Sequence, residues 1–190
     1  FPHITEKQVN TLYNTFNSSI KEYDYKGTFN AVFPLKVNQL PNFIHPLINE
    51  GKKFNYGLEA GSKAELVIAM TYNNVGSPIT VNGFKDKEMI HLGFIAKSMG
   101  HNITIIIEGL NELEIIIEVL NETKMECPNI GLRVRLHSGG SGLWAKSGGI
   151  NSKFGLTSTE ILEAYELMED NNLVKHLTMI HFHIGSAMNS

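Results

Sequence analysis

The segment NITIIIEGLNELEIIIEVLNETKMECPNIGLRVRL, residues 102–136, combines a strand-like run, a helix-like segment and a second strand-like run. Residues 102–108 and 130–136 are short and rich in Ile and Val, which is typical of buried strands. Residues 111–121 between them have helical character. Strands joined by a helix of this length lie parallel, with a right-handed crossover. The segment therefore predicts a parallel βα unit and the strand of the next unit.

The same alternation continues over most of the chain and predicts an α/β fold built from parallel βα units. We expect strands at residues 28–37, 53–58, 78–81, 102–108, 130–136 and 176–184. We expect helices at residues 40–50, 62–71, 86–98, 111–121 and 158–170. Ser62, followed by Glu65, and Ser158 mark helix starts, whereas Gly51 and Gly100 mark helix ends.

Six units are two fewer than a closed (β/α)8 barrel contains, and an open piece of six strands leaves two strand edges uncovered. We therefore expect a TIM barrel truncated to about six βα units over residues 25–190, after a lead-in segment at residues 1–24. The last two barrel units and a second domain would be absent. FPHITE at residues 1–6 separately looks like the interior of a longer polypeptide. The alternative is a doubly wound open sheet, which six strands would fill.

The composition indicates a globular protein with a small-molecule partner. The chain has 190 residues, of which 42% are hydrophobic, so it can bury a core. Its 16 basic and 19 acidic residues are intermixed, which provides no basic face for a nucleic acid or an anionic membrane. No apolar run approaches the roughly 18 residues of a membrane span. The single Cys127 cannot form an internal disulfide, so we expect a reducing cytoplasm.

Lys36 is the first candidate for chemistry, because it closes an apolar run in FPLKVNQ at residues 33–39. A lysine at the inner end of a parallel strand is held where water is scarce. Its amine can then stay partly neutral and form a Schiff base with a carbonyl cofactor. The competing interpretation is a surface lysine that only caps a strand. Pro34 in the same run cannot donate to a sheet and predicts a strand edge or a bulge.

Further motifs follow the predicted strands along the chain. They are GLEAGSKAEL at residues 57–66, VNGFKD at 81–86, GLRVRL at 131–136, SGGSGLW at 138–144, SKFGL at 152–156 and HFHIGS at 181–186. Together with KVNQ at residues 36–39, they resemble the biosynthetic arginine decarboxylases. Those enzymes belong to the alanine-racemase-like, fold type III class that uses pyridoxal 5'-phosphate. The resemblance covers residues 25–186.

The resemblance implies a (β/α)8 barrel that binds pyridoxal 5'-phosphate and decarboxylates L-arginine to agmatine and carbon dioxide in polyamine biosynthesis. It also implies a cytoplasmic homo-oligomer, a dimer or tetramer, and a magnesium ion whose site it does not locate. Other parts of the family's site would lie beyond Ser190, so we expect this piece to be inactive alone. After Ser186 the chain continues with Ala187 and Met188, where the family commonly has glutamine and an aliphatic residue.

Five residues match positions at which this family binds its cofactor. By the resemblance, Lys36 would hold the cofactor aldehyde and His183 would stack on the pyridine ring, and these two are the expected catalytic residues. Arg135 would reach the phenolic oxygen, Glu59 would orient the stacking histidine, and Ser186 would contact the phosphate or the ring substituents. Active sites of parallel barrels lie at the carboxyl ends of the strands, where the first four of these residues are expected.

Other interpretations of these residues are open. Arg133 lies on the same face of its strand as Arg135 and can be confused with it. His181 and His183 also share a face, which is how zinc hydrolases of the TIM-barrel type place two ligands. No further His or Asp ligands are evident at other predicted strand ends, so we expect no metal there. Either histidine could instead be a core residue, and the glycine-rich residues 138–149 could bind an anion or form a plain loop.

Two further functions also fit the motifs. One is a decarboxylase for another basic or diamino acid, such as diaminopimelate or carboxynorspermidine. The other is a non-catalytic carrier of pyridoxal phosphate, which would keep Lys36 and His183 but lack the downstream acid and base groups.

Overall fold

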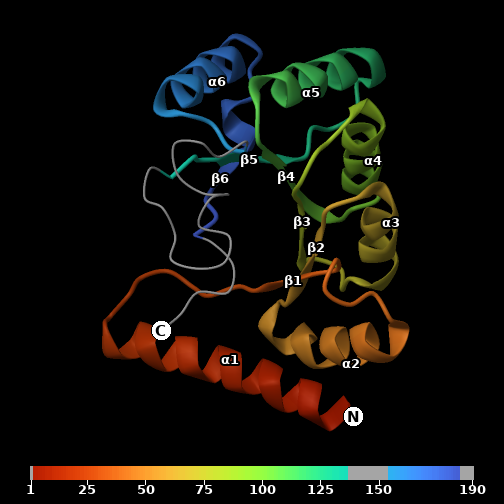
Figure 1. Ribbon diagram of the computed structural model, residues 1–190, viewed down its shortest axis with the longest axis vertical. Helices are drawn as coiled ribbons and strands as arrows, with labels where there is room; N and C mark the ends of the chain where they lie inside the picture. Colours follow the sequence, from red (N-terminus) through yellow and green to blue (C-terminus); the bar gives the residue numbers. More distant parts are fainter. Residues whose placement is uncertain (1, 137–153, 185–190) are drawn as a thin grey trace.

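A computed structural model describes residues 2–136 and 154–184, in which six parallel strands form one sheet (Figure 1). The strands are hydrogen-bonded in chain order, and every neighbouring pair is parallel. They are β1 (Val32–Pro34), β2 (Gly57–Ala60), β3 (Pro78–Val81), β4 (Asn102–Ile107), β5 (Asn129–Arg133) and β6 (Leu177–His181). The predicted alternation of parallel βα units is confirmed.

The helices between the strands lie within two residues of the predicted ranges. They are α2 (Pro41–Gly51), α3 (Lys63–Tyr72), α4 (Lys87–Ser98), α5 (Leu110–Thr123) and α6 (Ser158–Asp170), with short 3-10 helices η1 (Lys52–Phe54) and η3 (Val174–His176). Figure 1 shows α2 to α6 following one another along the outer side of the curved sheet. A doubly wound sheet has helices on both faces and a reversal of strand order, so that alternative is wrong. The described residues form part of a TIM barrel.

A further helix, α1 (Pro2–Glu22), precedes the barrel strands and was not predicted from the sequence. It lies along α2 (Figure 1) and buries Val9 and Tyr13. The Tyr13 ring stacks on Phe54 with ring centroids 4.3 Å apart, and its hydroxyl accepts a hydrogen bond from the Ala31 backbone N–H at 3.0 Å. The helix thereby fixes the segment that enters β1. Neither α1 nor any other described helix has the length and apolar content needed to cross a membrane.

Gly93 of α4 shows which face of the sheet the helices cover. A Cβ atom at this position would lie 2.8 Å from Cδ1 of Ile105 and 3.9 Å from Cδ1 of Ile103. These two isoleucines of β4 therefore point toward the helices. Because side chains alternate along a strand, Thr104 between them points to the inner face of the curved sheet. In the strand register, the residue of β3 opposite Thr104 is in turn opposite Glu59 of β2. Thr104 and Glu59 therefore belong to one row of side chains on the inner face, which is called the inner row below.

The first strand is shorter than predicted, because only three residues, Val32–Pro34, belong to β1. The backbone N–H of Leu35 donates to the Glu59 carbonyl at 2.9 Å. Since successive N–H groups of a strand point to opposite sides, the nitrogen of Pro34 faces away from β2. The proline therefore costs no hydrogen bond to β2, which explains why this strand tolerates it. Among the described residues β1 pairs only with β2, and β6 only with β5, which leaves two edges open as expected.

Helix caps agree with most of the sequence signals. Ser62 caps α3 by accepting a hydrogen bond from the Glu65 backbone N–H, as predicted. The cap of α6 is Thr157 rather than the expected Ser158, and Glu160 completes a capping box by accepting from the Thr157 N–H at 2.7 Å. Gly100 follows α4 with φ +90°, a conformation that glycine adopts without strain.

Candidate active site

Lys36 lies in the turn after β1, at the carboxyl end of the strand. It is exposed, and its amine has no hydrogen-bond or ion-pair partner among the described residues. The sequence predicted a position with little water. Lys36 is exposed instead because β1 has a described neighbouring strand on one side only. Among the described residues, the amine is therefore accessible at the carboxyl end of β1.

Two loops at this end are tied together beside Lys36. The carboxylate of Glu65, in the first turn of α3, accepts hydrogen bonds from the Gly61 backbone N–H at 2.7 Å and from Nε2 of Gln39 at 3.2 Å. Glu65 thus links the loop after β1 to the loop after β2. This contact limits how far the turn that carries Lys36 can move.

Glu59 lies on β2 in the inner row of the sheet and is half-buried. Its backbone carbonyl accepts the bond from Leu35, the residue next to Lys36. Its carboxylate has no hydrogen-bond partner among the residues that the structure describes. A half-buried carboxylate without a partner is available to a group that enters the site from the carboxyl ends of the strands.

Arg133 ends β5, and its guanidinium forms an ion pair with Glu108, the residue that follows β4. The Arg133 side chain is 15% exposed and that of Glu108 is 7% exposed. The guanidinium also lies over the ring of Phe154, 5.5 Å from its centroid. Arg133 is therefore a fixed, largely buried cation at the carboxyl ends of the central strands.

Arg135, which the sequence assigned to the cofactor, lies beyond the end of β5. Its Nε and Nη2 donate to the carbonyl of Gly155 at 3.2 and 2.9 Å. Its backbone N–H donates to the Leu156 carbonyl at 2.8 Å, and the Leu156 N–H donates to the Arg133 carbonyl at 2.7 Å. Arg135 therefore holds residues 154–156 against the end of β5. Within the described residues, Arg133 rather than Arg135 neighbours the inner row.

His181 ends β6 and is the register partner of Arg133. Its Nδ1 atom is buried and has no hydrogen-bond partner among the described residues. Burial lowers the pKa of His181, the positive charge of Arg133 lowers it further, and the negative charge of Glu108 opposes this shift. His183 follows two residues later and is exposed. Ser186 and the glycine-rich residues 138–149 lie outside the described residues.

A buried ion pair, which sequence analysis did not single out, lies behind Arg133 and Glu108. Nζ of Lys85, in the loop after β3, is 3.1 Å from Oε2 of Glu112 in the first turn of α5, and the two side chains are 0% and 5% exposed. Glu112 also accepts hydrogen bonds from the backbone N–H groups of Lys85 at 3.2 Å and Glu108 at 2.8 Å. Burial lowers the pKa of Lys85 and raises that of Glu112, and the opposite charge of each partner counteracts the shift.

Only part of this arrangement could be found in the sequence. Lys85 belongs to the VNGFKD motif, and Glu112 stands three residues after Gly109, where a carboxylate caps a helix start. Those signals identify a loop and a helix end separately. They do not show that the two side chains meet, because that contact depends on how α5 packs beside the loop after β3.

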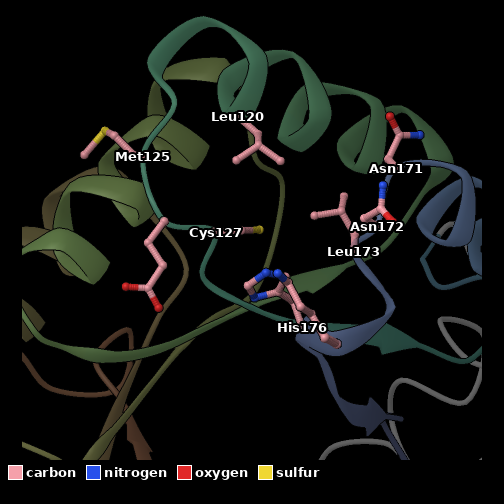
Figure 2. Close-up of a pocket in the computed structure, with 9 residues that line it drawn as sticks. Leu120, Met125, Cys127, Asn171, Asn172, Leu173 and His176 are labelled. Atoms are coloured by element: carbon pink, nitrogen blue, oxygen red, sulfur yellow. The ribbon is translucent and has the colours of Figure 1, made fainter.

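A cavity of about 550 Å³ lies at the opposite ends of the strands. Figure 2 shows the side chains of Cys127 and His176 pointing into it, with Leu120 and Leu173 nearby. Cys127 precedes β5 and His176 precedes β6, so this cavity faces away from Lys36 and Arg133. Burial raises the pKa of the Cys127 thiol to about 12. The candidate site is therefore defined by the strand ends and not by this cavity.

The described residues contain no group of three or more His, Cys, Asp or Glu side chains that could hold a metal ion. The zinc hydrolase alternative needs such a group around His181 and His183. Within residues 2–136 and 154–184, the two histidines have no further ligands to complete a zinc site.

Comparison with known proteins gives consistent matches over almost the whole chain. The model of the family described as "Pyridoxal-dependent decarboxylase, pyridoxal binding domain" matches residues 7–190. A biosynthetic arginine decarboxylase of Bacteroides thetaiotaomicron is 44% identical over 99% of this chain and 30% of its own length. The biosynthetic arginine decarboxylase of Phocaeicola vulgatus is 43% identical over the same shares. The chain thus spans about 30% of the length of these curated relatives.

Solved structures agree with these matches. The crystal structure of the biosynthetic arginine decarboxylase of Campylobacter jejuni is similar with a TM-score of 0.88 and 59% identity, over 98% of this chain and 29% of that one. A diaminopimelate decarboxylase of M. jannaschii in complex with L-lysine has a TM-score of 0.73 and 23% identity, over 96% of this chain and 41% of that one. The second likeness concerns the fold alone.

Proposed function

This chain belongs to the pyridoxal-dependent decarboxylases, as the motifs predicted, and we propose that its full-length protein decarboxylates L-arginine to agmatine and carbon dioxide. Arginine is supported as the substrate by the names of the relatives at 40–44% identity and of the solved structure at 59% identity. The observation that carries the proposal is that four residues lie at the carboxyl ends of one parallel sheet, namely Lys36 after β1, Glu59 on β2, Arg133 on β5 and His181 on β6. Active sites of parallel barrels are built there.

The residues present fit pyridoxal phosphate. The amine of Lys36 is exposed and has no partner among the described residues, so it can bind an aldehyde. Within the described part of the chain, the buried Nδ1 of His181 lacks a hydrogen-bond partner, and Arg133, paired with Glu108, places a largely buried guanidinium beside it. A polar, anionic ligand at this end could bind to both side chains. When bound, pyridoxal phosphate supplies an aldehyde for amines and an electron-withdrawing ring that stabilises the negative charge left as the carboxylate departs.

Each candidate site residue then has a proposed role. Lys36 would hold the cofactor through its amine. The exposed ring of His183 would hold the cofactor ring in position. The carboxylate of Glu59, which has no hydrogen-bond partner among the described residues, would orient His183 by accepting a hydrogen bond from it. Ser186 would bind the phosphate or the ring substituents.

The two arginines receive different tasks. Both Nε and Nη2 of Arg135 are engaged by the Gly155 carbonyl. We propose that Arg133, directed by Glu108 toward the inner row, is the guanidinium that favours the ionised phenolic oxygen of the cofactor. Arg135 supports the site by holding residues 154–156, which carry the ring of Phe154 to the Arg133 guanidinium.

The proposal includes a homo-oligomer in the cytoplasm and a place for agmatine in polyamine biosynthesis. These parts follow the resemblance to the arginine decarboxylases. The magnesium ion that the resemblance also implies finds no fitting group of ligands in the described residues, and no step of the proposal passes through it.

Spectroscopy and gas release together test this function. The full-length protein with pyridoxal phosphate should show a visible absorption band that borohydride removes, and it should release CO2 from arginine. Lys36→Ala should abolish both. The matched control is Lys53→Ala, which removes an exposed lysine from η1, away from the carboxyl ends of the strands. If Lys36→Ala leaves the band and the CO2 release intact, Lys36 is not the cofactor lysine.

The same measurements separate the alternatives. A non-catalytic carrier would show the band without CO2 release, and a decarboxylase for another diamino acid would release CO2 from diaminopimelate but not from arginine. A zinc hydrolase would contain stoichiometric zinc and show no band. The 190-residue piece alone should bind the cofactor weakly and release no CO2.

A further inference from the structure

We propose that Glu108, Lys85 and Glu112 are positioning residues that hold Arg133 at the cofactor site, an inference that rests on the function proposed above. These three residues are called the support group below. None of them is assigned to bind cofactor or substrate. Their contacts form a continuous connection from the loop after β3 to the end of β5.

The connection starts at Lys85. Its Nζ is 3.1 Å from Oε2 of Glu112, and it also donates to the Gly83 carbonyl within its own loop. Glu112 in turn accepts a hydrogen bond from the Glu108 backbone N–H at 2.8 Å. The Glu108 carboxylate then forms the ion pair with Arg133. Glu112 therefore fixes the backbone of Glu108, and Glu108 fixes the guanidinium of Arg133.

The burial of these charges indicates a role other than holding the helices together. Removing two charges from water costs free energy that their mutual attraction does not always recover, so buried ion pairs are weak evidence for a contribution to stability. Helices α4 and α5 are already joined by exposed ion pairs. Nζ of Lys87 is 2.9 Å from Oε1 of Glu118 and 2.7 Å from Oε1 of Glu122. The buried pair, in contrast, contacts the backbone of Glu108, whose carboxylate pairs with Arg133 at the site.

The charges of the connection also balance. Lys85 and Arg133 carry two positive charges, and Glu108 and Glu112 carry two negative charges. With its partner in place, the Arg133 guanidinium keeps one direction, toward the inner row next to His181. Without the Glu108 carboxylate, the guanidinium would lose its charged partner and could turn toward solvent or toward the cofactor phosphate.

The test compares variants of the full-length holoprotein. Glu108→Gln removes the charge that directs Arg133 but keeps a side chain of the same size. Lys85→Met combined with Glu112→Gln removes the buried pair without leaving an uncompensated charge, and it replaces the carboxylate that accepts from the Glu108 N–H by a weaker, neutral acceptor. The matched control is Lys87→Met, which removes exposed ion pairs between α4 and α5. Each protein is measured for cofactor Kd, for the position of the visible band, and for kcat and KM with arginine.

We expect Glu108→Gln and the double variant to weaken cofactor binding about tenfold and to lower kcat by about tenfold to a hundredfold, with KM nearly unchanged. The visible band should shift, because the charge next to the cofactor moves. Lys87→Met should match the wild type within about twofold in every quantity. Support-group variants that match the wild type as closely as Lys87→Met would overturn the inference.

A double-mutant cycle tests the route through Arg133. If Glu108 acts by directing Arg133, then Glu108→Gln should have no further effect on cofactor Kd in a protein that already carries Arg133→Met. Additive effects would show that Glu108 acts independently and would refute the inference. A wild-type protein without the visible band would instead refute the proposed function. The two failures are therefore distinguishable.

Discussion

Arg133 and His181 are register partners at the carboxyl ends of β5 and β6, and the cation of Arg133 therefore lies next to the half-buried imidazole of His181, whose Nδ1 atom is buried. A second positive charge at this position would be unfavourable. Burial and Arg133 both lower the pKa of His181 below its ordinary value of 6.5, and Glu108 only partly opposes them. The neutral imidazole and the Arg133–Glu108 ion pair can thus coexist at one end of the sheet.

Protonation of His181 should destabilise the folded protein. The unfolded chain binds this proton near pH 6.5 and the folded chain resists it, so the contribution of His181 to stability is present above about pH 6.5 and is lost as the pH falls. Denaturant unfolding of the wild type between about pH 8 and 5 should show decreasing stability. In His181→Gln the decrease should be smaller, although His176, whose pKa burial also lowers, contributes in the same direction. Identical pH dependence in the two proteins would contradict the lowered pKa of His181 in the folded protein.

Lys85→Met should strongly destabilise the protein, because it leaves the Glu112 carboxylate buried without its charged partner. Breaking a buried ion pair from one side costs about 3–5 kcal/mol. The double variant with Glu112→Gln should recover part of this loss, since both charges are then absent. Urea unfolding monitored by circular dichroism measures the difference. Lys87→Met, at an exposed ion pair, should cost no more than about 1 kcal/mol, and an equal loss in both lysine variants would show that burial is not the cause.

The sequence predicted the fold, which the structure confirms, whereas the assignment of the site residues stays a prediction. The limits of β3 were correct, and α5 was placed within two residues, because apolar periodicity is a local property of the chain. The length of β1 was not predicted, since the apolar residues before Val32 lie outside the sheet. The helix α1 was missed because its main signal is the tertiary packing of Val9 and Tyr13, whereas most of its surface is polar.

The two arginines Arg133 and Arg135 show why site residues are harder to choose from a sequence than strands and helices. Both lie on the same face of one strand in the sequence pattern, and only the point at which β5 ends separates them. That point depends on Leu156, which comes from more than twenty residues later and bonds to the backbone of both arginines. The lysine at the end of β1 was placed correctly, but its exposure depends on the neighbours of β1, which a local pattern does not reveal.

Thr157 should matter more than Ser158 at the start of α6. The Thr157 side chain accepts from the Glu160 N–H, while Ser158 is already the first residue of the helix. Thr157→Ala should therefore cost about 1 kcal/mol of unfolding free energy, and Thr157→Ser should restore most of it. Ser158→Ala should have almost no effect. Thermal unfolding of the three variants provides the measurement, and a larger loss in Ser158→Ala than in Thr157→Ala would show that the cap was assigned to the wrong residue.

Cys127 should react slowly with thiol reagents while the protein is folded. Cys127 is buried, and burial raises the pKa of its thiol from 9.0 to about 12. Because only the thiolate reacts, a rise of this size reduces the reactive fraction at pH 8 by roughly a thousandfold. A disulfide reagent followed by absorbance should label the native protein slowly and the denatured protein at once. Rapid labelling of one thiol in the native protein would mean that the cavity beside Cys127 admits the reagent and ionises the thiol.

Gly57→Ala should destabilise the sheet, because this glycine lies where β2 passes β3 at close range. A Cβ atom at Gly57 would lie 1.9 Å from the backbone carbonyl oxygen of Pro78. Backbone atoms of two paired strands cannot move apart without disturbing the ladder, so the substitution should cost about 2 kcal/mol or more. The control is Gly61→Ala, where the nearest atom to the new Cβ would be a Glu65 carboxylate oxygen at an ordinary 3.5 Å. Chemical denaturation of both variants decides the point: equal stability of Gly57→Ala and Gly61→Ala would show that β2 and β3 are not packed as closely as the structure places them.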